Sequence, residues 1–264
     1  MLPARLATAA VAIPLLLGLI FWAPPWGMTV VVTVLAVLAV AEYAGLAFSA
    51  QPRERALMLG LGTGVVLAAA CGPGPWLTAT LAAFVLFGMT WIVLTRPDLE
   101  RGLGDFGLIA VGVLYVGLLL PHFIWLHRLD GGPGWVAFVI AVGMAGDTGG
   151  YFIGHAFGRR RLIPRVSPGK TVEGAVGVLL GSALGAVFAN LLFLRARPWS
   201  EIIALAIFLG VIGQLGDLSE SVMKRSFGAK ESGWIFPGHG GVLDRIDSLL
   251  FPVSFVYYYW YCVT

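Results

Sequence analysis

The sequence predicts an all-α integral membrane protein, a polytopic bundle of about nine transmembrane helices. Of its 264 residues, 58% are hydrophobic and only 12% are charged, whereas a soluble domain carries about 25% charged residues. The uncharged runs 6–41 and 56–95 are each long enough for two crossings, because one crossing needs about 20 apolar residues. These observations exclude a water-soluble globular protein.

Turn residues and charges divide the apolar sequence into nine predicted segments. They are residues 6–23, 28–48, 56–71, 76–95, 106–126, 135–157, 172–194, 201–222 and 246–262. The uncharged turns around Pro24 and Pro73 are typical of tight helical hairpins. The first segment follows Arg5, as in a signal peptide, but Pro24 and the immediate second apolar run favour a retained helix.

The basic residues predict the orientation of these segments, because Lys and Arg concentrate in cytoplasmic loops. With the N-terminus inside, 14 of the 17 basic residues lie in cytoplasmic loops, and only Arg128, Arg195 and Arg197 lie outside. An odd number of crossings then places the C-terminus outside. This distribution accounts for the net charge of +3, so we expect no nucleic-acid partner.

The chain divides into a transmembrane scaffold of about five helices, residues 1–130, and a catalytic transmembrane region, residues 131–264, with a site facing the cytoplasm. Glu42 is the only charged residue inside a predicted crossing of the scaffold. At a helix end it is expected to reach water, and an intramembrane functional group is the alternative. Cys71 and Cys262 form neither a metal-type pair nor a disulfide framework.

The first polar group of the catalytic region is Asp147, about halfway along an apolar run. An ionised carboxylate at this depth costs about 2.5–3.5 kcal/mol on insertion scales. We therefore expect Asp147 to be paired, bound to a metal or exposed to a wet cavity. The alternative is a structural Asp that is bonded to neighbouring hydroxyl groups.

The second polar group is Ser167-Pro168-Gly169-Lys170-Thr171-Val172-Glu173-Gly174, which follows four arginines and leads into an uncharged helix. Its Gly-Lys-Thr triplet is similar to a Walker A loop, but Pro164 stands where that motif requires glycine, so we exclude a P-loop. Backbone N–H groups at a helix start, with the Lys170 and Thr171 donors, predict a phosphate site. The alternative, that the bases only anchor the loop, does not account for Ser167 and Glu173.

The third polar group carries carboxylates and bases at helical spacing. One helical face presents, at i, i+3, i+4 and i+7, Asp217, Glu220, Ser221 and Lys224. The last helix begins with the same i, i+3, i+4 spacing in Asp244, Asp247 and Ser248. Carboxylates beside bases predict a hard cation such as Mg²⁺, shared with substrate phosphates. His239, in a glycine-rich turn between the two sets, is a base, a phosphate ligand or only a turn residue.

This region resembles the signature of the bacterial phosphatidate cytidylyltransferases, also called CDP-diacylglycerol synthases. The resemblance is carried by Ser221-Val222-Met223-Lys224-Arg225, by Lys230, and by Pro237-Gly238-His239-Gly240-Gly241-Val242-Leu243-Asp244-Arg245-Ile246-Asp247. The Asp147-Thr148 and 167–174 segments are also similar to that family, so the likeness covers residues 140–250 in detail. Two residues depart from it: Glu231 replaces the usual Asp, and Trp234 stands where a small polar residue is expected.

The resemblance implies an enzyme of phospholipid biosynthesis in the bacterial inner membrane. It would join CTP and phosphatidic acid into CDP-diacylglycerol and pyrophosphate, require Mg²⁺, allow a second cation and form a homodimer. We expect Asp217 and Asp244 to bind the metal, with Asp147 and Asp247 as ligands or close neighbours. The predicted nucleotide site comprises Ser167, Lys170, Thr171, Glu173 and His239. The predicted catalytic set comprises Asp217, Asp244, Asp247, and three phosphate-holding bases, Lys224, Arg225 and Arg245.

Two other functions stay open. Another CTP-dependent lipid enzyme, such as a polyprenol kinase, would transfer the γ-phosphoryl group and leave CDP. An ion-coupled transporter would use Asp147 and Asp217 as ion sites. A transporter would carry comparable polar helix breaks in both halves of the chain, whereas here they are confined to the second half.

Overall fold

The computed structural model describes residues 2–96, 98–194, 197–233 and 240–263. Each of the nine predicted segments overlaps a helix. The helices are α1 (Leu2–Phe21), α2 (Pro25–Ala47), α3 (Pro52–Cys71), α4 (Pro75–Thr95), α5 (Leu99–Gly112), the π-helix η1 (Val113–Leu118), α6 (His122–His127), α7 (Gly132–Phe157), α8 (Val172–Leu192), α9 (Trp199–Ser226) and α10 (Leu243–Val263). The fifth predicted segment, 106–126, is divided among α5, η1 and α6.

Helix starts follow from local sequence. Helices α2, α3 and α4 each begin with a proline, Pro25, Pro52 and Pro75, because the first helical position needs no N–H donor. Asp98 caps α5 by accepting a hydrogen bond from the Arg101 N–H at 3.1 Å.

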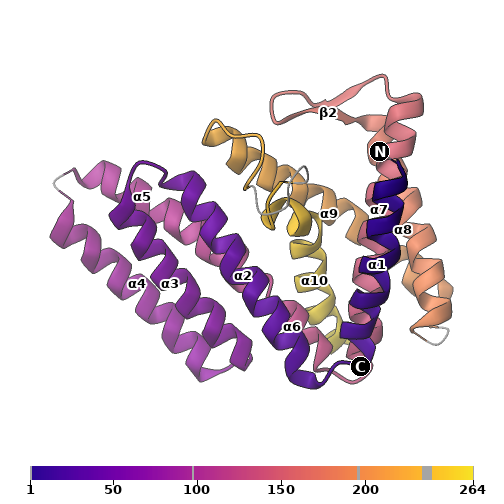
Figure 1. Cartoon of the computed structure of the whole chain (residues 1–264), viewed down its shortest axis with the longest axis horizontal. Coiled ribbons are helices and arrows are strands. Elements are labelled where there is room, and N and C mark those ends of the chain that lie inside the picture. The colour runs from indigo at the N-terminus through magenta and orange to yellow at the C-terminus, as the bar shows by residue number, and fades with distance from the viewer. Residues whose placement is uncertain (1, 97, 195–196, 234–239, 264) are drawn as a thin grey trace.

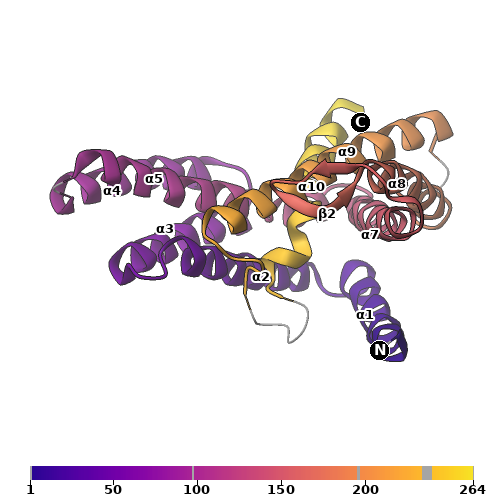
Figure 2. The ribbon, with the colours of Figure 1, turned by 90° about the horizontal axis from the view of Figure 1, so that it is seen from above.

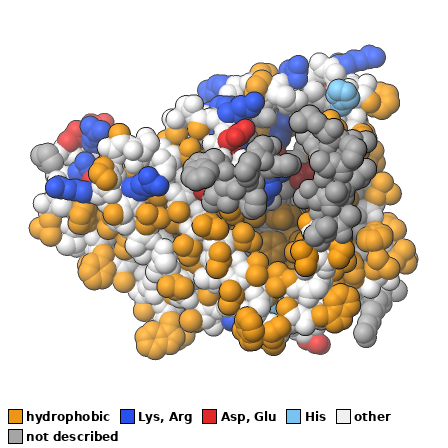
Figure 3. Space-filling model, in the orientation of Figure 1, with side chains coloured by type: hydrophobic (Ala, Val, Ile, Leu, Met, Phe, Trp, Pro, Cys, Tyr) orange, Lys and Arg blue, Asp and Glu red, His pale blue; other side chains and the backbone are white. Residues whose placement is uncertain are grey.

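Seven helical segments of the described chain are long and apolar enough to cross a membrane. They are α2, α3, α4, the continuous stretch Glu100–His127, α7, α8 and α9. The apolar stretch Ala12–Phe21 of α1 is shorter, and α10 is not among the seven. Hydrophobic side chains cover much of the surface in Figure 3. The chain is therefore an all-α, multi-pass membrane protein.

The helices form two groups. Figure 1 and Figure 2 show α3, α4 and α5 at one end of the molecule and α7 with α8 at the other, while α2, α9 and α10 lie between them. Helices α7 and α8 make the most extensive helix contact. A Cβ atom on Gly149 or Gly181 would meet backbone of the facing helix, so glycine permits this close approach.

The π-helix η1 joins the two groups beside α9. The Tyr115 hydroxyl donates a hydrogen bond to the Gly216 carbonyl at 2.9 Å, and the Tyr115 and Phe251 rings pack edge to face at 5.8 Å. Single π-helical turns are frequent at functional sites. Through Tyr115, the N-terminal half of the chain thus contacts Gly216, the residue that precedes Asp217.

Residues 161–171 form a β-hairpin, which we did not predict from the sequence. Strand β1 (Arg161–Ile163) pairs antiparallel with β2 (Ser167–Thr171), and Arg161 lies opposite Thr171. At the end of β2, Thr171 has the extended backbone of an N-cap residue, and its hydroxyl oxygen accepts the Gly174 N–H at 3.0 Å at the start of α8. The predicted phosphate loop is thus a two-stranded projection from the helix bundle (Figure 1).

Candidate active site

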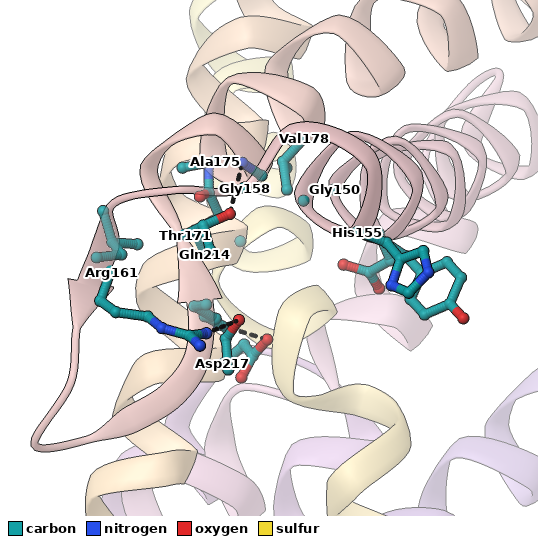
Figure 4. Close-up of a pocket in the computed structure, with 17 residues that line it drawn as sticks. Gly150, His155, Gly158, Arg161, Thr171, Ala175, Val178, Gln214 and Asp217 are labelled. Carbon is teal, nitrogen blue, oxygen red and sulfur yellow. Dashed lines mark hydrogen bonds and ion pairs between the residues drawn. The ribbon is translucent and has the colours of Figure 1, made fainter.

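A polar pocket of about 570 Å³ lies between α7, the β-hairpin, α8 and α9. Its polar lining side chains are Asp147, Tyr151, His155, Arg161, Lys170, Thr171, Gln214 and Asp217. In Figure 4, His155 lies across the pocket from Arg161 and Asp217. Four residues that the sequence assigned to metal or nucleotide therefore meet here, namely Asp147, Lys170, Thr171 and Asp217.

Lys170 and Asp217 are paired in this pocket. The Lys170 Nζ lies 2.6 Å from the Asp217 Oδ2, and their side chains are 25% and 31% exposed. The sequence assigned Lys170 to phosphate and Asp217 to metal as separate roles. Their direct contact means that any phosphate or cation entering the pocket competes with, or joins, this ion pair.

Thr171 and Glu173 hold the hairpin against α8. Thr171 is 8% exposed, and its hydroxyl oxygen is used as the α8 cap described above. The Glu173 carboxylate accepts hydrogen bonds from the backbone N–H groups of Arg159 at 3.0 Å and Arg160 at 3.2 Å. Neither Ser167 nor Glu173 is among the described residues that line the pocket. The Thr171 hydroxyl and the Glu173 carboxylate therefore both fix the hairpin to the start of α8.

A second polar cluster lies where α9 ends and α10 begins; we call it the Lys224 cluster, comprising Glu220, Lys224, Ser232 and Asp244. The Lys224 ammonium forms ion pairs with the fully buried Glu220 and, at 2.5 Å, with Asp244. The Asp244 Oδ2 also accepts hydrogen bonds from the Ser232 N–H at 2.9 Å, the Ser232 hydroxyl at 2.8 Å and the Gly241 N–H at 2.8 Å. Asp244 is thus well satisfied by protein groups.

Ser248 connects α10 with the polar pocket. Its hydroxyl donates a hydrogen bond to the Asp147 Oδ2 at 3.2 Å, and its backbone N–H donates one to the Asp247 Oδ1 at 2.7 Å. Asp147 is exposed to the pocket as well as bonded to this hydroxyl.

The four predicted metal ligands are divided between two places. Asp147 and Asp217 line the polar pocket, while Asp244 and Asp247 are not among its described lining residues. No three His, Cys, Asp or Glu side chains converge as a metal site in the part of the chain that the structure describes. Asp244 is instead bonded to Lys224 and to the backbone N–H groups of Ser232 and Gly241.

The remaining predicted site residues lie at the surface or outside the described ranges. The Arg225 guanidinium donates a hydrogen bond to the Ala229 carbonyl at 3.1 Å, and both Arg225 and Arg245 are exposed. Glu231 is exposed as well. His239 and Trp234 fall outside the described residues.

Glu42 has a bonding role that the sequence did not predict. We expected it to reach water, but its carboxylate accepts hydrogen bonds from the backbone N–H groups of Val242 and Leu243, each at 2.9 Å. Glu42 is partly exposed, and its carboxylate reaches these backbone donors because the end of α2 packs against the start of α10. The available signal was its position as a lone acid in a long apolar segment.

Comparison with known proteins places this sequence in a family. Residues 3–263 match the model of the cytidylyltransferase family. A phosphatidate cytidylyltransferase of Bacillus subtilis is 39% identical over 176 residues, which are 66% of this chain and 64% of that protein. One of Thermotoga maritima is 33% identical over 186 residues, 68% of each chain. One of Haemophilus influenzae is 44% identical over 130 residues, 48% of this chain and 45% of that protein.

The family match extends over almost the whole chain, whereas the match to the Bacillus subtilis relative spans just under two thirds of that protein. The matched range contains the polar pocket, the Lys224 cluster and Glu42. The chain belongs to the cytidylyltransferase family.

Proposed function

We propose that the protein is a phosphatidate cytidylyltransferase, which converts CTP and phosphatidic acid into CDP-diacylglycerol and pyrophosphate in phospholipid biosynthesis. The observation that carries this proposal is the polar pocket, where Lys170 and Asp217 meet at one end of a bundle of apolar helices. A reaction between a water-soluble nucleotide and a lipid requires a charged site that opens at the membrane boundary. Family membership and the relatives' names support the same reaction.

In the proposed step, a phosphate oxygen of phosphatidic acid attacks the α-phosphorus of CTP. The new bond joins that oxygen to the α-phosphorus, and the bond to the bridging oxygen of pyrophosphate breaks. Both substrates are anionic, so cationic groups must offset their repulsion. Lys170 would bind nucleotide phosphate by moving its ammonium away from Asp217 and toward the phosphate. Arg161, which lines the same pocket, would neutralise a second phosphate.

Mg²⁺ fits the donor set of the polar pocket. Mg²⁺ is usually bound by one or two carboxylates together with substrate phosphates, and Asp147 and Asp217 provide two carboxylates. In the pocket these two carboxylates stand beside two cationic side chains, Lys170 and Arg161, which would be available to bind the phosphates that share the metal.

Asp147 and Asp217 would therefore hold Mg²⁺, with room for a second cation, and the metal would neutralise phosphate charge. Ser248 orients Asp147 through its hydroxyl. Asp244 is bonded to Lys224, and its use as a ligand would require Lys224 to move away.

We also infer nine crossings, with the N-terminus in the cytoplasm and the C-terminus outside. In support, α1 begins at the hairpin end of the molecule and α10 ends at the opposite end (Figure 1). Most Lys and Arg side chains visible in Figure 3 lie toward the hairpin end, as the charge rule requires for a cytoplasmic face. The bacterial inner membrane and a homodimer are proposed on the resemblance and the bacterial relatives.

The proposed function is tested with CTP labelled on its α-phosphate, supplied with phosphatidic acid and Mg²⁺ to the purified protein. We expect label in the lipid phase together with release of pyrophosphate. A lipid-phase label obtained only from γ-labelled CTP would identify a kinase instead. Absence of label in the lipid phase from α-labelled CTP, with the protein folded, would refute the cytidylyltransferase. If γ-labelled CTP supplied with a polyprenol also gave no labelled lipid, the kinase would be refuted too and the transporter favoured.

A further inference from the structure

We propose that Glu42 is a positioning residue of the active site, which fixes the start of α10 and thereby the Asp244 carboxylate. This inference rests on the proposed cytidylyl transfer. Glu42 lies on α2, in the half of the chain that the sequence presented as scaffold. Its role is to act through α10, without touching substrate.

The Glu42 carboxylate spans two successive backbone donors. Its Oε1 accepts the Val242 N–H and its Oε2 accepts the Leu243 N–H, each at 2.9 Å. The first N–H groups of a helix have no partner within the helix, and negative charge is favourable there because of the helix dipole. Glu42 thus caps α10 with a side chain from another helix.

Ser232 links Glu42 to Asp244. The buried Ser232 hydroxyl lies 3.2 Å from the Glu42 Oε2 and 2.8 Å from the Asp244 Oδ2. The Asp244 carboxylate in turn holds Lys224 at 2.5 Å. A displacement of the Glu42 carboxylate would therefore reach the Lys224 ammonium through two hydrogen-bonded groups.

The surrounding chain is built to admit the Glu42 side chain. A Cβ atom on Gly233 would lie 2.6 Å from the Glu42 Oε1, and one on Gly241 would collide with the Glu42 Oε2. The neighbouring Tyr43 ring packs edge to face on Phe227 just after α9, at 5.9 Å. The end of α2 therefore contacts both the end of α9 and the start of α10.

The principal test is Glu42→Gln, which keeps the side-chain shape. A carboxamide has one acceptor oxygen and an NH₂ donor, so it can satisfy only one of the two backbone N–H groups and opposes the other. The matched control is Glu54→Gln, also in the N-terminal half, where Glu54 pairs with Arg96 at 2.6 Å and is 13% exposed. The conservative variant Glu42→Asp retains the charge.

We expect Glu42→Gln to lower kcat on the order of 10²-fold, the cost of about a 1 Å misplacement, with little change in KM for CTP. KM for CTP is preserved because Glu42 does not line the pocket in which Lys170 would bind CTP. Glu42→Asp should recover part of kcat, and Glu54→Gln should retain it. Ser232→Ala should add little to Glu42→Gln, because both act on the same bonds.

Hydrogen exchange provides a measurement that is independent of activity. We expect the backbone amides of Val242 and Leu243 to exchange faster in Glu42→Gln than in the unmodified protein. Unchanged exchange, an unchanged kcat, or fully additive losses with Ser232→Ala would overturn the positioning role. If the unmodified protein transfers no cytidylyl group, the proposed function fails, while faster exchange in the variant would still support the fixing of α10 by Glu42.

Discussion

The Lys170 ammonium and the Asp217 carboxylate lie 2.6 Å apart in the polar pocket. This ion pair ties strand β2 of the hairpin to α9. It also joins, in one contact, the residue that suits phosphate and the residue that suits a hard cation. Occupation of the pocket by a nucleotide and a metal ion would therefore separate the pair and give each group an external partner of opposite charge.

We expect Lys170→Ala to raise KM for CTP and to lower kcat/KM on the order of 10- to 100-fold, because a hydrogen bond to a charged group contributes about 1.5–3 kcal/mol. Steady-state kinetics with varied CTP measure the effect. The control is Arg53→Ala, an exposed base in the first turn of α3, which should leave kinetics unchanged. An unaltered CTP response would reduce Lys170 to a topological anchor.

Asp147→Asn and Asp217→Asn should remove most cytidylyl transfer and shift the Mg²⁺ titration to higher concentration. The amide keeps the shape and one acceptor but loses the charge that binds a hard cation. Asp98→Asn is the control, because Asn caps a helix about as well as Asp. Normal Mg²⁺ titrations in both pocket variants would rule out these ligands.

Asp244→Asn distinguishes a metal ligand from a holder of Lys224. We expect it to lower activity and the melting temperature in detergent, since an amide NH₂ would face the Ser232 and Gly241 donors that Asp244 now accepts. The Mg²⁺ titration of the remaining activity should be unchanged. A titration shifted as strongly as in Asp217→Asn would instead make Asp244 a ligand.

Gly181→Ala should lower the melting temperature in detergent and reduce activity. Its new methyl group would collide with the Ala145 carbonyl of α7, and separation of α7 from α8 would widen the polar pocket. Gly64→Ala on α3 is the control, because nothing lies within 4 Å of its added methyl group. Equal melting temperatures for the two variants would show that the α7–α8 contact tolerates expansion.

The inferred orientation predicts the accessibility of single cysteines. In a background with Cys71 and Cys262 replaced by Ser, Gly169→Cys in the hairpin should react with an impermeant reagent only after cells are permeabilised. Gly74→Cys, in the turn between α3 and α4, should react in intact cells. Both positions have open space around them. Rapid labelling of Gly169→Cys in intact cells would place the hairpin outside and contradict the inferred orientation.

The sequence by itself determined the nine helical segments, the membrane environment and the polar side chains that can bind a metal ion or phosphate. Apolar runs and proline or glycine turns are local properties, so they predict where helices begin and end without any knowledge of their packing. The helical spacing of Asp217, Glu220 and Lys224 is local too. The family signature is also local, because it depends on consecutive residues, and the match of residues 3–263 to the cytidylyltransferase family agrees with it.

The tertiary structure alone decided which of these residues are partners. Glu42 and Val242 are 200 residues apart in the chain, so no spacing rule relates them, and the capping of α10 by α2 follows only from helix packing. The same holds for Lys170 with Asp217, and for the separation of Asp244 from the polar pocket. In an apolar bundle, buried charges take whichever partner the packing brings within reach, because leaving them unpaired is costly.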